Sequence, residues 1–97
     1  MRVVWTEYAY SRLDEAMAFI ARDRPETAIA WLERILDKGA SVAEFPDRGR
    51  VVPETSRQDV RELIISPYRL VYRRDPDVVT ITMVVLGRRR LDAEDMG

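Results

Sequence analysis

Three stretches rich in β-branched and aromatic residues follow one another near the C-terminal end of the chain. They are Val60–Ile65, Leu70–Arg73 and Val78–Leu86, separated by the turns Ser66-Pro67-Tyr68 and Asp75-Pro76-Asp77. Short runs of this composition, bounded by turn-forming residues, are typical of strands. We therefore predict an antiparallel meander, and the rest of the chain has to pack against it.

Two helical segments precede this meander. After a short candidate strand at Arg2–Thr6, apolar residues recur at helical spacing, and Thr6 can cap a helix that runs from Glu7 to about Arg22. The residues Asp23-Arg24-Pro25 interrupt this helix, because the residue before a proline is disfavoured in the α conformation. A second helix is then predicted from Pro25 through Gly39 to about Glu44, which gives a helical hairpin.

The predicted order of elements is β-α-α-β-β-β, an α+β fold in which the helical hairpin covers one face of an antiparallel sheet. The 97 residues fit a single domain, 1–97, and the first strand should pair with the last, because it would otherwise be isolated. Alternation along the last strand assigns four residues to the helix-covered face: Val79, Ile81, Met83 and Val85. The opposite face should carry Val71, Val84 and Leu86.

Residues that are absent restrict the chemistry. The chain has no Cys and no His, so it lacks thiolate chemistry, the usual general acid or base, and the commonest metal ligands. We expect no metal and no cofactor. No stretch has the length of a membrane span, and acidic residues follow the N-terminus too closely for a signal peptide, so we expect a cytoplasmic protein.

Positive charge is concentrated on the meander although the net charge is −1. Residues 56 to 90 contain eight Arg and four acidic residues, whereas residues 91 to 97 contain only acidic charges. The local positive charge of the meander is therefore more informative about binding partners than the net charge of the whole chain. For the strand arginines, the alternative to a binding role is a solvated sheet face with pairs to Asp59, Glu62 and Asp75. For Arg88–Arg90, the alternative is neutralisation by the acidic tail.

A series of short motifs resembles one known family. The series comprises Trp5 at the end of the first strand, the Asp-x-Pro helix break, EFPDRGRVVPE, VREL, PYRLVYR and GRRRL. Together they resemble the ParE branch of the ParE/RelE toxin superfamily over nearly the whole chain. One departure is Leu86, which precedes Gly87-Arg88-Arg89 where ParE-like chains commonly have His-Gly-Arg-Arg.

The resemblance implies a toxin of a bacterial type II toxin–antitoxin system. Its expected partners are a ParD-like antitoxin of the ribbon-helix-helix type and DNA gyrase, which it would inhibit by stoichiometric binding rather than as an enzyme. One alternative is a ribosome-dependent mRNA endoribonuclease like RelE. Unless the protein is such a nuclease, we expect its contact with nucleic acid to be only indirect. A third possibility is an inactive homologue that still binds antitoxin. No membrane partner is expected.

Three sets of residues are candidates for these roles. Target binding is assigned to Arg88, Arg89 and Arg90. Antitoxin binding is assigned to charged and apolar residues on the face away from the helices: Arg61, Arg69, Val71, Arg73, Val84 and Leu86. A nuclease would use Arg61 and Arg69 with Tyr68 or Tyr72, although both tyrosines are more commonly packing residues. An unperturbed tyrosine, with a pKa of about 10, is a poor base at neutral pH.

Overall fold

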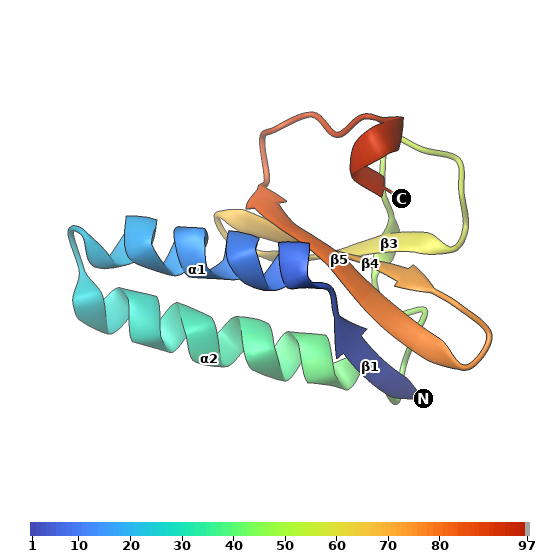
Figure 1. Cartoon of the computed structure of the whole chain (residues 1–97), viewed down its shortest axis with the longest axis horizontal. Helices are drawn as coiled ribbons and strands as arrows, with labels where there is room; N and C mark the ends of the chain where they lie inside the picture. Colours follow the sequence, from blue (N-terminus) through green and yellow to red (C-terminus); the bar gives the residue numbers. More distant parts are fainter. Residues whose placement is uncertain (97) are drawn as a thin grey trace.

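The computed structural model describes residues 1–96, with the side chain of Met96 excepted. The elements in chain order are β1 (Arg2–Trp5), α1 (Glu7–Ala21), α2 (Pro25–Ser41), β2 (Arg50–Val51), β3 (Val60–Ile65), β4 (Tyr68–Arg74), β5 (Val78–Leu86) and the 3₁₀ turn η1 (Ala93–Met96). The strands form one sheet in the order β1-β5-β4-β3-β2. Figure 1 shows the two helices running beside each other, with the sheet against them. The predicted α+β architecture is confirmed.

The meander β3-β4-β5 is antiparallel, as predicted, and β1 lies beside β5, its predicted neighbour. Two details differ from the prediction. Strand β1 pairs with β5 in parallel, starting from Arg2 opposite Val78, so the sheet is mixed and not wholly antiparallel. A fifth strand, β2, pairs with β3 through only two residues, Arg50 opposite Glu62 and Val51 opposite Arg61.

The helix boundaries follow the predicted capping and proline signals closely. Thr6 caps α1 by accepting a hydrogen bond at Oγ1 from the backbone N–H of Ala9 (2.9 Å). Helix α2 starts at Pro25 and continues through Gly39, ending at Ser41, three residues before the predicted end. A methyl group at Gly39 would lie 3.3 Å from Cδ1 of Ile81 and 3.4 Å from the Trp5 ring. The internal glycine therefore allows α2 to approach the sheet closely.

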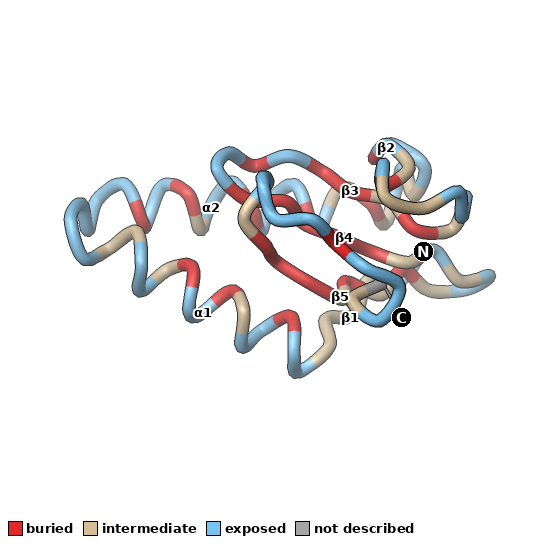
Figure 2. Tube along the Cα trace, turned by 90° about the horizontal axis from the view of Figure 1, so that it is seen from above, coloured by how far each residue is buried: buried red, intermediate tan, exposed pale blue. Residues whose placement is uncertain are grey.

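Both faces of the sheet are covered. The helical hairpin covers one face, where the main core includes Trp31 and Ile35 of α2 and Leu70 of β4. The other face carries a smaller core beneath the segment after β2 and the C-terminal tail: Val52, Val60, Val71, Met83, Val85 and Leu91. Figure 2 shows buried residues concentrated along β3, β4 and β5. A single helical layer would cover one face of the sheet and leave the other open to a partner. In the described residues, the second face is covered as well.

A β-bulge in β5 explains the errors in the predicted faces. Val71 is opposite Met83, but its neighbour Tyr72 is opposite Ile81, so Thr82 is an extra residue. Side chains alternate between the two faces of a strand. One inserted residue therefore moves each later side chain to the face opposite the one predicted for it.

The prediction for the first half of β5 is therefore confirmed, and the prediction for the second half is wrong. Val79 and Ile81 lie in the core beneath the helices, as predicted. Met83 and Val85 belong instead to the smaller core on the opposite face. Val84 and Leu86, which were expected to face away from the helices, pack with the helix-side core.

Candidate functional site

A buried arginine lies at the centre of the face opposite the helices. Arg69 of β4 is only 3% exposed, and its guanidinium contacts two carboxylates. Nη1 lies 2.9 Å from Oε1 of Glu62, and Nη2 lies 2.9 Å from Oε2 of Glu54. Nη2 also donates to the backbone carbonyl of Arg89. A buried charge is tolerable only when paired in this way, so Arg69 is part of an internal network and not of a solvated sheet face.

Glu54 is the network residue that sequence reasoning missed. It follows β2 in a segment without a clear period, and its only signal is an acidic residue directly after Val52-Pro53. Oε2 accepts a hydrogen bond from the backbone N–H of Leu91 (2.8 Å) in addition to the Arg69 contact. The hydrogen bonds from Arg69, opposed by burial and assisted by the bond from Leu91, lower the pKa of Glu54 to about 2.

This lowered pKa predicts a loss of stability in acid. In the unfolded chain Glu54 has its ordinary pKa of 4.5, above the folded value of about 2, so its contribution is complete above the unfolded value. As pH falls from 4.5 to about 2, up to roughly 3 kcal/mol should be lost. Urea unfolding of the wild type and of Glu54→Gln, measured across this range, should give stabilities that converge at low pH. Parallel curves would contradict the assignment.

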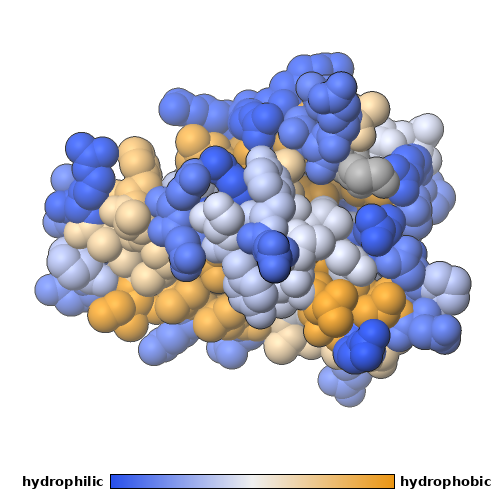
Figure 3. Space-filling model, viewed as in Figure 1, coloured by the Kyte–Doolittle hydropathy of each residue, from blue (hydrophilic) through white to orange (hydrophobic). Residues whose placement is uncertain are grey.

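The Arg88–Arg90 run has exposed side chains on an ordered backbone. Gly87 donates its N–H to the carbonyl of Pro67 (2.8 Å), and Arg89 donates to the carbonyl of Leu86 (3.0 Å). In the view of Figure 3 the region where the chain continues past β5 is mainly hydrophilic. The exposed apolar residues Ile29 and Leu36 lie instead on α2.

A second residue not anticipated from the sequence, Arg50 of β2, joins this run. It is held by Glu62, with Nε 2.6 Å from Oε2, and its side chain is 61% exposed. Arg50 and the three arginines line one surface hollow of about 370 Å³. The alternative interpretation, neutralisation by the acidic tail, applies in the described residues to Arg89, whose Nη2 lies 3.4 Å from Oδ1 of Asp95. Within residues 1–95, Arg88 and Arg90 form no ion pair with an acidic side chain.

The two tyrosines are packing residues. Tyr68 is buried against Trp31, with 5.1 Å between ring centroids. Tyr72 is fully buried, and its hydroxyl donates to the carbonyl of Pro46 (2.8 Å) and accepts from the N–H of Gly49 (3.0 Å). Burial raises the pKa of both hydroxyls, slightly offset at Tyr68 by the charge of Arg12 and at Tyr72 by the bond from Gly49.

The remaining strand residues do not form the single surface that was predicted for antitoxin binding. Arg61 lies opposite Tyr72 and therefore on the helix side of the sheet, where it donates to the carbonyl of Gly49 (2.9 Å). Arg73 lies on the other face and pairs with Asp75 (3.0 Å). Val71 is fully buried beneath the chain's own segments. With the displacement of Val84 and Leu86 described above, these residues are divided between two faces.

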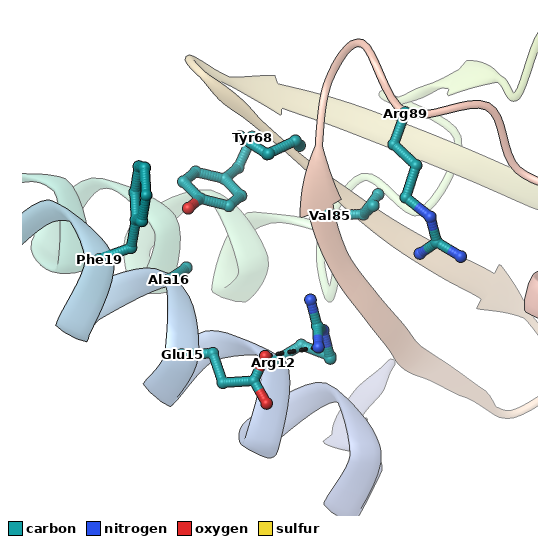
Figure 4. A pocket seen from close by; sticks show the side chains of 8 residues that line it. Arg12, Glu15, Ala16, Phe19, Tyr68, Val85 and Arg89 are labelled. Atoms are coloured by element: carbon teal, nitrogen blue, oxygen red, sulfur yellow. Dashed lines mark hydrogen bonds and ion pairs between the residues drawn. The ribbon is translucent and has the colours of Figure 1, made fainter.

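An apolar groove lies between α1 and the end of β5 (Figure 4). Its volume is about 230 Å³, and it is lined by Arg12, Glu15, Ala16, Phe19, Tyr68, Val85, Leu86 and Arg89. Phe19 is 59% exposed, and in Figure 4 its ring lies beside that of Tyr68 while Arg12 extends from α1 toward β5. Strand β1 pairs only with Val78–Ile81. Among the described residues, no strand pairs with the outer edge of β5 beyond them.

Comparison with known proteins places this architecture in a family. Residues 3–92 match the model of the ParE toxin of the type II toxin–antitoxin system parDE. The chain belongs to the ParE toxin family. A curated relative, "Putative toxin Y4kP" of Sinorhizobium fredii (strain NBRC 101917 / NGR234), is 35% identical over 85 residues, which cover 86% of this chain and 85% of that protein.

A solved structure has the same fold as this ParE-family chain. It is described as a chromosomal ParDE system from P. aeruginosa and superposes with a TM-score of 0.74 at 20% identity, over 89% of this chain and 95% of the other. The family relationship and the shared fold confirm the resemblance inferred from the motifs, and with it the assignment as a toxin of a type II system.

No helix in the described part is long and apolar enough to cross a membrane. The same residues contain no group of three or more acidic side chains arranged as a metal site. Of the predicted site residues, the fold brings Arg88, Arg89 and Arg90 together, whereas it separates the antitoxin set and encloses Arg69, Tyr68 and Tyr72.

Proposed function

We propose that this ParE-family chain is a cytoplasmic toxin that inhibits DNA gyrase by stoichiometric binding through Arg88–Arg90. The observation that carries the proposal is the exposed arginine run on a backbone fixed by other parts of the chain. Arg50 extends the same surface. Guanidinium groups suit both carboxylates on a protein and phosphates on gyrase-bound DNA, because they form paired hydrogen bonds with either.

The contacts of the nuclease candidates also favour binding over catalysis. RNA cleavage by a 2′-hydroxyl group needs a base, an acid and cations near the phosphate. The pKa values of Tyr68 and Tyr72 are raised, so both hydroxyls keep their protons at neutral pH. The guanidinium of Arg69 is already engaged by Glu54 and Glu62. These residues support a structural role.

The proposal is tested by titrating purified toxin into a gyrase supercoiling assay, with a cell-free translation assay in parallel. We expect supercoiling to stop near equimolar toxin and translation to continue. Transcript cleavage on ribosomes with normal supercoiling would favour the nuclease alternative. Antitoxin binding with neither effect would favour an inactive homologue.

We further propose that a ParD-like antitoxin neutralises the toxin by placing an acidic amphipathic segment in the groove between α1 and β5. Leu86, Phe19 and Tyr68 provide apolar surface there, and Arg12 and Arg89, which pair with Glu15 and Asp95 in the toxin alone, contribute positive charge. The open edge of β5 beyond Ile81 could also pair with an extended segment. Of the predicted antitoxin-binding residues, Leu86 is the one that lines this groove.

Replacing Phe19 by Asp should weaken antitoxin binding by about 100-fold, because it removes an exposed aromatic anchor and adds a repelling charge. The matched control is Phe45→Asp, since Phe45 is 60% exposed against 59% for Phe19 and follows α2 outside the groove. Isothermal titration with the antitoxin encoded beside the toxin measures both dissociation constants. Equal effects of the two variants would contradict the proposed groove.

A further inference from the structure

The backbone of the arginine run is fastened by side chains from distant parts of the sequence. The N–H of Leu91 donates to Oε2 of Glu54 (2.8 Å), and the carbonyl of Arg89 accepts from Nη2 of Arg69. The side chain of Leu91 is itself only 2% exposed and packs in the smaller core with Val52. Two polar tethers and one apolar anchor therefore act within three consecutive residues.

Glu54 connects these tethers. Its two oxygens accept from both terminal nitrogens of Arg69, at 3.1 Å for Oε1 and 2.9 Å for Oε2. The second oxygen is the one that also holds Leu91. One carboxylate thus joins strand β4 to the segment that follows β5.

We infer that Glu54 is a positioning residue which, through Arg69, fixes the backbone that displays Arg88, Arg89 and Arg90. The inference rests on the proposed function only in assigning these arginines to target binding. Arginine side chains lose rotamer freedom when they bind, and a backbone that is already ordered adds no further ordering cost. A loosened run would keep its charge and yet bind more weakly.

Glu62 provides a control that separates positioning from stability. It is buried and contacts the same guanidinium, with Oε1 2.9 Å from Nη1 of Arg69. Its other contact is Arg50 of β2, and it has no bond to residues 87–91. Glu54→Gln and Glu62→Gln each remove one negative charge from beside Arg69, but only Glu54 itself accepts a hydrogen bond from the segment after β5, at Leu91.

The experiment uses the full chain carrying either substitution. Limited trypsin digestion, with cleavage sites mapped by mass spectrometry, reports how mobile the backbone is at Arg88, Arg89 and Arg90. We expect Glu54→Gln to increase cleavage there by about tenfold and Glu62→Gln to change it little, each at a temperature where the variant is folded. Supercoiling inhibition should weaken by about tenfold for Glu54→Gln, whereas Glu62→Gln is compared by trypsin cleavage only, because Glu62 also holds Arg50 of the target-binding surface.

A measurement on the wild type covers the case in which Glu54→Gln does not fold. The Leu91 amide should exchange with solvent deuterium at least about tenfold more slowly than an unprotected amide. Exchange at the unprotected rate, or equal trypsin cleavage in the two variants, would overturn the inference. Loss of protection in Glu54→Gln alone supports it even if the wild type leaves gyrase active, a result that would overturn the proposed function instead.

Discussion

Replacing Arg88, Arg89 and Arg90 together by Ala is expected to weaken gyrase inhibition by about 100-fold or more, which is about 2.7 kcal/mol of binding free energy. The three side chains are exposed, so the loss should come from contacts to the target and not from the fold. The backbone tethers at Arg89 and Leu91 are unaffected by the change. Half-maximal inhibition in the supercoiling assay, with thermal unfolding alongside, measures the effect.

A control removes the same charge elsewhere. Arg2, Arg34 and Lys38 are exposed residues of β1 and α2, and their replacement by Ala should leave inhibition almost unchanged. Because association guided by charge is screened by salt, inhibition by the wild type should also weaken as ionic strength rises. Equal losses in the two triple variants would show that total charge, and not the arginine run, governs binding.

The elements of the fold were predictable because their signals are local. The cap at Thr6, the break at Pro25 and the β-branched runs of the meander each act over a few residues, and all were observed, although β4 begins at Tyr68, which had been predicted to lie in the preceding turn. The pairing of β1 with β5 followed from the need to satisfy an otherwise isolated strand. Its parallel direction depends on how the helical hairpin returns the chain, for which the sequence carries no local signal.

The bulge at Thr82 was not predictable either, because it too has no local signal in the sequence. The alternation of Thr80 and Thr82 with apolar neighbours reads as one uninterrupted strand. The insertion becomes visible only in the pairing with β4, where Val71 and Tyr72 lie opposite Met83 and Ile81. One unpaired residue was therefore enough to place Val84 and Leu86 on the wrong face and to misplace part of the predicted antitoxin surface.

The exposed part of the candidate site could be predicted from the sequence, whereas the buried part could not. Arg88–Arg90 could be identified from composition alone, because consecutive arginines after a strand cannot all be buried. The burial of Arg69 depends on Glu54, which is 15 residues away in a segment without periodicity. A pairing over that distance leaves no pattern in a single sequence, so Arg69 was interpreted as a surface residue.

The largest effect on stability is expected for Arg69→Ala, with a loss of about 3–5 kcal/mol. The substitution leaves the carboxylates of Glu54 and Glu62 buried without their shared cation. A loss of this size is a large part of the roughly 5–15 kcal/mol that stabilises an ordinary domain, so the urea concentration at the midpoint of unfolding should fall markedly. Urea unfolding at neutral pH measures the loss. Arg73→Ala, on the same face of β4 but in a half-exposed pair with Asp75, should cost less than about 1 kcal/mol.

A rescue experiment separates lost packing from uncompensated charge. In Arg69→Met combined with Glu54→Gln and Glu62→Gln, none of the three charges of this buried network remains. Neutral replacement of a whole buried ionic network is often close to thermodynamically neutral, so more than half of the lost stability should return. The reference is Arg69→Met alone, which has the same side-chain volume at position 69 but leaves both carboxylates without their shared cation. If the combined variant is as unstable as Arg69→Met, the network stabilises the fold through its hydrogen-bond geometry and not through charge balance.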